Sequence, residues 1–314
     1  MKSSFLFIFL LSTCFSSHLI MAQPDEFSPT YVYPVKHVVL ANGISMAYVE
    51  EGPADGPVVL MVHGLGGYIK NWYPTIEGLK DQFRCIAIDL PGYGRSTIRE
   101  FSSEDFMAFF AASVHEFVNR LSLSEVVLMG HSMGGQVSIV TALEQPKWLK
   151  KLVLAAPAGL EVFNEQEATA LKQYAAAELL KQHSEAQIRA AYQANFVNMP
   201  DAAEAMIQDR LQAKSAPWFE AYAKVRERGV YGMLDHPVKD QLSKIDVPTL
   251  IIFGANDLLI PNRYLHVGMT TRQVAEVGRS IPRVEIRFIE AAGHMLQMDR
   301  PTDFNLIVNQ YLME

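Results

Sequence analysis

Short apolar runs alternate with longer helical stretches through most of this chain. Eight of the runs are rich in β-branched residues and are predicted to be strands. They are residues 38–40, 44–49, 58–62, 85–88, 126–129, 152–155, 250–253 and 284–289. Amphipathic stretches such as 103–121 and 136–144 separate the later runs. This alternation is typical of a mainly parallel sheet flanked by helices, so we expect an α/β fold with eight strands.

The first two predicted strands are separated only by Ala41-Asn42-Gly43. An Asn-Gly pair between apolar runs is a strong signal for a tight β-hairpin. We therefore expect the sheet to begin antiparallel and to become parallel further along the chain.

The alternation stops between residues 159 and 236, where the composition shifts to Ala, Glu, Gln, Lys and Leu. This region is predicted to be all-helical. The expected helices are residues 165–181, 185–196, 202–214 and 218–228. Because the strand pattern resumes afterwards, we expect an inserted helical cap, or lid, at 159–236 within a core formed by residues 23–158 and 237–314.

Composition is that of an ordinary globular protein, with 49% hydrophobic and 19% charged residues among 314. The formal net charge is −7, and the chain contains no long run of Lys or Arg. A nucleic-acid backbone would be repelled by most of such a surface, so we expect no nucleic-acid partner. No pattern in the sequence predicts the oligomeric state.

The N-terminus has the order of a secretory signal peptide: Lys2, an apolar block at 5–11, small residues near Ala22 and a polar start at Gln23. A membrane anchor is the alternative, but polar residues at 12–18 interrupt the apolar run before it reaches the roughly 18 to 20 residues that a span needs. Residues 1–22 are therefore expected to be removed, leaving a secreted or periplasmic protein without a stable membrane span. Lipidation at Cys14 is a further alternative.

Removal of this segment would leave Cys85 as the remaining cysteine, so no intrachain disulfide is expected. Cys85 lies in a short apolar strand, where a cysteine usually acts as a small hydrophobic residue. The nine histidines are scattered, and the glycine-rich loops lack a P-loop lysine. We expect neither a metal nor a cofactor.

Residues 126–135, VVLMGHSMGG, combine a predicted strand, a GxSxG motif and the start of a helix. In this context the motif holds a serine on a sharp turn with its hydroxyl exposed above the sheet. The alternative is a glycine-rich turn with an incidental serine. Ser132 is the predicted nucleophile.

A serine needs a base to take its proton and a third group to orient that base. Asp257 follows the predicted strand 250–253, and His294 follows the last strand, 284–289. Each could by itself be an ordinary turn or loop residue. Because all three follow strands in the order Ser, Asp, His, we predict a triad of Ser132, Asp257 and His294.

An acyl-transfer site also needs backbone N–H groups that stabilise the developing oxyanion. The loop His63-Gly64-Leu65-Gly66-Gly67 follows the strand 58–62. We assign the amides of Leu65 and Met133 to the oxyanion hole. His63 and His131 are predicted to be structural hydrogen-bonding residues, with His131 pointing away from the serine.

Five ordered segments resemble the α/β-hydrolase superfamily, in particular its branch of cofactor-free serine esterases, lipases and C–C bond hydrolases with a helical cap. They are HGLGG (63–67), DLPGYGRS (89–96), GHSMGG (130–135), GANDLLIP (254–261) and GHMLQMDRP (293–301). Haloalkane dehalogenases and epoxide hydrolases carry an aspartate in place of Ser132, so the resemblance disfavours those reactions. The loop at 63–67 also lacks the HGGPG pattern usual in proline iminopeptidases. Asp89 is expected to be architectural.

The predicted cap is rich in large apolar residues, some of which must roof Ser132, and Met295 and Leu296 add apolar surface beside His294. The cap sequence shows no cluster of arginines that would suit a strongly anionic group, so we do not expect a strongly anionic ligand. The sequence therefore predicts a serine hydrolase that cleaves a small hydrophobic carboxylic ester through an acyl-enzyme on Ser132. The alternatives are a C–C bond hydrolase, a perhydrolase and a non-catalytic ligand-binding protein of the same fold.

Overall fold

The computed structural model describes residues 28–314. The predicted signal segment, residues 1–22, and the alternative lipidation site Cys14 lie outside these described residues. Within residues 28–314, no helix has the combination of length and apolar character required to cross a bilayer.

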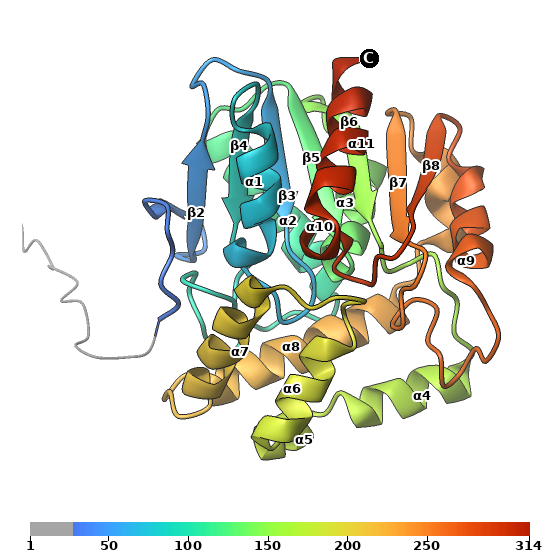
Figure 1. The fold of residues 1–314 in the computed structure, drawn as a ribbon. Helices are drawn as coiled ribbons and strands as arrows, with labels where there is room; N and C mark the ends of the chain where they lie inside the picture. Colours follow the sequence, from blue (N-terminus) through green and yellow to red (C-terminus); the bar gives the residue numbers. More distant parts are fainter. Residues whose placement is uncertain (1–27) are drawn as a thin grey trace, which may run out of the picture.

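The core of the fold is an eight-stranded sheet with the order β1-β2-β4-β3-β5-β6-β7-β8 (Figure 1). The strands are β1 (Lys36–Val39), β2 (Ser45–Glu51), β3 (Val58–Val62), β4 (Arg84–Ile88), β5 (Val126–His131), β6 (Leu149–Ala155), β7 (Thr249–Gly254) and β8 (Val284–Ile289). β2 pairs antiparallel with β1 and β4, whereas the neighbours from β4 to β8 are parallel. The predicted mostly parallel α/β sheet with an antiparallel beginning is confirmed.

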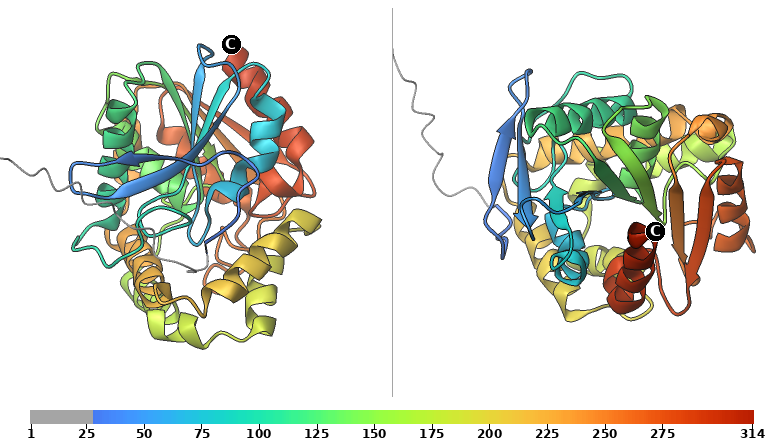
Figure 2. Two further views of the ribbon diagram at one scale, coloured as in Figure 1. Left: turned by 90° about the vertical axis from the view of Figure 1, so that its left-hand side faces the viewer. Right: turned by 90° about the horizontal axis from the view of Figure 1, so that it is seen from above.

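Helices cover both faces of the sheet, which explains why every residue of β3, β5 and β7 is buried. Helices α1 (Tyr73–Leu79) and α11 (Pro301–Met313) lie on one face, and α2 (Phe106–Arg120) and α3 (Met133–Leu143) lie on the other (Figure 2). The other elements outside the predicted cap are α9 (Thr271–Val277), α10 (Leu296–Asp299), η1 (Ile69–Trp72), η2 (Lys239–Lys244) and η3 (Gly278–Ser280).

Between β6 and β7 the chain forms five α-helices, which lie beyond the carboxyl ends of the parallel strands (Figure 1). They are α4 (Glu165–Tyr174), α5 (Ala177–Gln182), α6 (Glu185–Gln193), α7 (Asp201–Ala213) and α8 (Phe219–Asp235). The single helix expected at 165–181 is divided into α4 and α5. In contrast, α8 continues beyond residue 228, through Gly229 and Gly232.

Both glycines of α8 lie close to the core, because a Cβ on Gly232 would lie 3.1 Å from Phe106 Cβ, and one on Gly229 would lie 3.1 Å from Met133 Sδ. Glycine weakens a helix locally, which is why the sequence pattern suggested an earlier end. Close contact with the core holds the helix there instead. We refer to residues 159–236 as the cap.

The strand register brings the carboxyl ends of neighbouring strands to the same level. Val62 of β3 pairs with Gly130 of β5, and Gly254 of β7 pairs with Ile289 of β8. The loops that follow these strands therefore meet at one edge of the sheet, beneath the cap.

Candidate active site

Ser132 occupies a strained turn between β5 and α3. Its backbone has φ 54° and ψ −119°, a conformation that non-glycine residues rarely adopt. The Ser132 N–H donates to the carbonyl of Ala155, 3.0 Å away, which ties the turn to β6. A Cβ on Gly134 would collide with the carbonyl oxygens of Val62 and His63. The GxSxG spacing therefore allows this turn to pack directly on the loop after β3.

The three predicted triad residues form one hydrogen-bonded chain. His294 Nε2 lies 2.9 Å from Ser132 Oγ, and His294 Nδ1 lies 2.7 Å from Asp257 Oδ2. The carboxylate accepts the proton on Nδ1, which leaves Nε2 free to accept the serine hydroxyl proton. The arrangement provides a nucleophile, a base and a group that orients the base.

Asp257 is itself held in place. Its Oδ1 accepts the N–H groups of Leu259 at 2.7 Å and Ile260 at 3.0 Å, so Oδ2 is presented to the histidine. The side chains of Asp257 and His294 are 0% and 4% exposed. Burial excludes water that would otherwise compete for these hydrogen bonds.

Two free backbone N–H groups lie beside the nucleophile, as an oxyanion hole requires. No hydrogen bond to a described acceptor engages the amide of Leu65 or that of Met133. The loop carrying Leu65 is close to the serine, since a Cβ on Gly64 would lie 2.9 Å from Ser132 Cβ. The side chains of Leu65 and Met133 both meet the cap at Gly229.

A family model for the alpha/beta hydrolase fold matches residues 57–301. The chain belongs to this family. The matched region contains the triad, the loop after β3 and the whole cap, so the resemblance in the five sequence segments is confirmed. Hydrolysis is the activity class that the family and its relatives support.

The alignments with similar proteins extend over most of this hydrolase. (E)-2-((N-methylformamido)methylene)succinate hydrolase of Acinetobacter baylyi is 25% identical over 88% of this chain and 97% of its own length. A solved structure of a probable hydrolytic enzyme from Pseudomonas aeruginosa has a TM-score of 0.79 at 24% identity, covering 90% of this chain and 95% of the other. A thermophilic esterase from Thermogutta terrifontis has a TM-score of 0.72 at 25% identity, covering 89% and 98%.

The other two histidines of the site are structural in their contacts. In this hydrolase, His63 Nδ1–H donates to the Gly64 carbonyl at 2.8 Å, while Nε2 accepts the Leu90 N–H at 3.0 Å. His131 points to the carbonyl of His294, with its Nε2 at 2.9 Å, and so connects the turn at Ser132 to the loop that carries His294. Burial lowers the pKa of His63 to about 4 and that of His131 to about 3, so both are neutral near pH 7.

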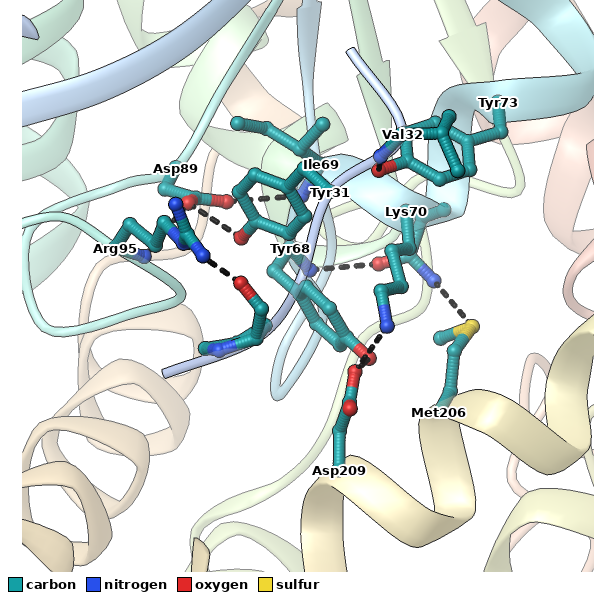
Figure 3. Close-up of polar contacts among 12 residues, drawn as sticks. Tyr31, Val32, Tyr68, Ile69, Lys70, Tyr73, Asp89, Arg95, Met206 and Asp209 are labelled. Carbon is teal, nitrogen blue, oxygen red and sulfur yellow. Dashed lines mark hydrogen bonds and ion pairs between the residues drawn. The ribbon is translucent and has the colours of Figure 1, made fainter. Parts of the chain in front are cut away.

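Asp89 connects three segments behind the loop after β3 (Figure 3). Its carboxylate accepts the Tyr31 hydroxyl at 2.6 Å and the backbone N–H groups of Ile69 and Arg95, both at 2.8 Å. Burial raises the pKa of Asp89 to about 6, although these donors favour the charged form. All three contacts are to the protein itself, in keeping with the architectural role expected of Asp89.

Asp299 was not singled out in the sequence, yet it connects the loop of the base to the cap. Its carboxylate accepts the N–H of Gly293, next to His294, at 2.8 Å. It also accepts two N–H groups of the cap, from Val197 at 2.7 Å and Asn198 at 3.1 Å. The distance in sequence between residues 197 and 299 explains why no local pattern revealed this connection.

The cap contains two neighbouring arginines, contrary to the expectation of none suited to an anion. Arg210 of α7 and Arg226 of α8 are close enough for the charge of one to affect the other. They come from different helices, so only the packing of α7 against α8 brings them together. Several cap aromatics are buried as expected, including Phe196, Phe219 and Tyr222, whereas Tyr174 is 76% exposed.

Proposed function

We propose that this protein is a carboxylic-ester hydrolase that forms an acyl-enzyme on Ser132. The observation that carries the proposal is the position of His294, which lies within hydrogen-bond distance of both Ser132 and Asp257. A hydroxyl in this arrangement can lose its proton to the imidazole as it attacks a carbonyl carbon. The esterase of similar fold from Thermogutta terrifontis supports the same chemistry.

The reaction would proceed in two halves. His294 Nε2 takes the hydroxyl proton while Ser132 Oγ bonds to the carbonyl carbon, and the amides of Leu65 and Met133 stabilise the oxyanion. When the tetrahedral intermediate collapses, the bond to the alcohol oxygen breaks and His294 gives its proton to the leaving alcohol. Water then repeats the sequence on the acyl-enzyme, releasing the carboxylic acid and restoring Ser132.

The cap would act as a lid that selects a substrate with a hydrophobic body. Leu65 and Met133 contact Gly229 of α8, so the cap closes directly over the assigned oxyanion amides. Met295, next to His294, adds a buried apolar side chain. Export to a secreted or periplasmic location, after cleavage before Gln23, is part of this proposal. The intact mass of the mature protein tests it, and an acyl group on Cys14 would contradict it.

The test of activity is hydrolysis of p-nitrophenyl esters of increasing acyl length. We expect turnover by the wild-type protein and a loss of at least about 10³-fold in Ser132→Ala. Ser113→Ala is the matched control, because Ser113 is a buried serine of α2 whose hydroxyl bonds to the carbonyl of Phe109. Equal activity in the wild type and Ser132→Ala, or no ester turnover by either protein, would contradict the proposal.

A further inference from the structure

The guanidinium end of Arg210 is buried, although the residue as a whole is only partly so. Its terminal nitrogens Nη1 and Nη2 are inaccessible to solvent and have no hydrogen-bond partner among the described residues. Its guanidinium carbon lies 4.5 Å from the ring centroid of Phe219 and 5.1 Å from that of Tyr222. Aromatic faces stabilise the charge in part, but they do not accept the in-plane N–H groups. Such donors are costly to bury without an acceptor.

Arg226 adds a second positive charge without a carboxylate partner. It forms no ion pair or hydrogen bond with the residues that the structure describes. Its Nε would lie 3.5 Å from a Cβ on Gly66, the residue after Leu65. Burial lowers the pKa of Arg210, and the nearby charge of Arg226 lowers it further.

The carboxylate next to Arg210 in sequence does not neutralise it. Asp209 instead accepts the Tyr68 hydroxyl and the Lys70 ammonium group, both at 2.6 Å (Figure 3). The negative charge of Asp209 is therefore balanced by Lys70 and not by Arg210. Arg210 and Arg226 therefore remain an uncompensated pair, even though the whole chain has a net charge of −7.

A small cavity adjoins Arg210. Asp209, which is paired with Lys70, also lines it, whereas Arg226 lies outside the lining and approaches Gly66. The cavity has a volume of about 40 Å³, and its lining includes Gly66, Tyr192, Arg210 and Tyr222. Because one water needs on the order of 10–15 Å³, the cavity has room for about three water-sized groups. A carboxylate has three heavy atoms. Gly66 belongs to the loop that carries Leu65, so the cavity borders the candidate active site.

We propose that Arg210 and Arg226 form an anion subsite that binds a carboxylate or phosphate group carried by the ester substrate. The planar guanidinium of Arg210 would supply paired N–H donors, and Arg226 would supply the second charge beside the oxyanion loop. The substrate class is an ester with a hydrophobic body and one anionic group. This subsite rests on the proposed esterase function for its role in catalysis, although its affinity for anions can be measured without turnover.

Calorimetric titration of the full-length Ser132→Ala protein with monomethyl adipate or inorganic phosphate tests the subsite directly. We expect binding of at least one anion, with Kd weakened at least tenfold by adding Arg210→Met or Arg226→Met. Arg279→Met is the control, since Arg279 is an exposed arginine paired with Glu276. Thermal unfolding checks that each variant is folded, and the two subsite variants provide independent tests. Absence of binding, or binding that neither subsite variant weakens, would overturn the proposal.

Two substrate pairs show which part of the ester carries the anion. Monomethyl adipate is compared with methyl hexanoate for an acyl-side carboxylate, and a monobutanoyl glycerol phosphate with monobutanoyl glycerol for an alcohol-side phosphate. In at least one pair, we expect kcat/KM to favour the anionic ester at least tenfold and Arg210→Met to remove this preference. Turnover of neutral esters without any anion preference would overturn the subsite and leave the esterase proposal standing. Arg210-dependent binding of an anion without any Ser132-dependent turnover would support the subsite and overturn the esterase proposal.

Discussion

Replacing Asp299 with alanine should disturb the base of the triad without touching it. The carboxylate accepts three backbone N–H groups, one from Gly293 beside His294 and two from Val197 and Asn198 of the cap. In addition, the N–H of Met295 donates to the carbonyl of Asn195 at 3.0 Å. We therefore predict that Asp299 is a positioning residue that holds the loop of His294 against the cap.

The expected cost in stability follows from these three bonds. A hydrogen bond to a charged group contributes about 1.5–3 kcal/mol net, but Asp299 is only partly buried and water would replace part of the loss. We therefore expect Asp299→Ala to lower the free energy of unfolding by about 2–4 kcal/mol, which corresponds to a decrease in Tm of about 4–10 °C.

The expected cost in activity comes from misplacing His294. A displacement of about 1 Å at a reacting group can reduce the rate by about 100-fold, so kcat/KM for a p-nitrophenyl ester should fall by about 10- to 100-fold, mainly through kcat. Asp299→Asn should give a smaller loss, because the amide keeps one acceptor oxygen. Asp303→Ala is the control, since the partner of Asp303 within residues 28–314 is Arg300, on the surface.

A positioning role and a merely structural role of Asp299 lead to different results. The expected losses are at least about tenfold in kcat/KM and about 4 °C in Tm. If Asp299→Ala instead matched Asp303→Ala within about threefold in kcat/KM and about 2 °C in Tm, Asp299 would neither position His294 nor stabilise the loop. A fall in Tm with unchanged kcat would assign Asp299 to stability alone.

Two further predictions concern the triad and the buried histidines. Asp257→Asn should reduce kcat by about 10³- to 10⁴-fold with little change in KM, because the amide no longer holds the proton on His294 Nδ1; comparison of kcat and KM with the wild type checks this, and a loss below tenfold would contradict it. The folded protein should lose stability as the pH falls from 7 to 5, measured as the midpoint of guanidinium unfolding. The unfolded chain binds protons at His63 and His131 below a pKa of about 6.5, whereas the folded chain resists them down to about 4 and about 3, at a cost of about 1.4 kcal/mol per pH unit for each histidine. Asp89 offsets the contribution of one histidine below pH 6. Its raised pKa of about 6 means that the folded chain protonates this carboxylate at a higher pH than the unfolded chain does. A midpoint that rises on acidification would contradict this, and exposed His37→Gln should leave the trend unchanged.

Much of the fold was predictable because the signals are local. Apolar runs marked the strands, and the Asn-Gly pair marked the antiparallel beginning, where residues 41–43 form a short loop and Gly43 adopts φ 78°. Element ends were predicted less well. The helix α8 runs on through Gly229 and Gly232, because contacts with Met133 and Phe106 outweigh the low helix propensity of glycine.

The candidate catalytic residues were recognisable from the chain alone. A serine in GxSxG, followed by Asp257 and His294 after later strands, requires only motif and order. The parallel sheet then brings their loops together, because the carboxyl ends of its strands lie at one edge.

The surroundings of the candidate triad, in contrast, depend on long-range packing. The contacts of Asp299 with Val197, and the proximity of Arg210 and Arg226, join elements whose spacing in the chain carries no periodic signal. They depend on how the cap helices pack on one another and on the core. Periodicity specifies which face of a helix is buried, but not which polar side chains of two different helices meet there.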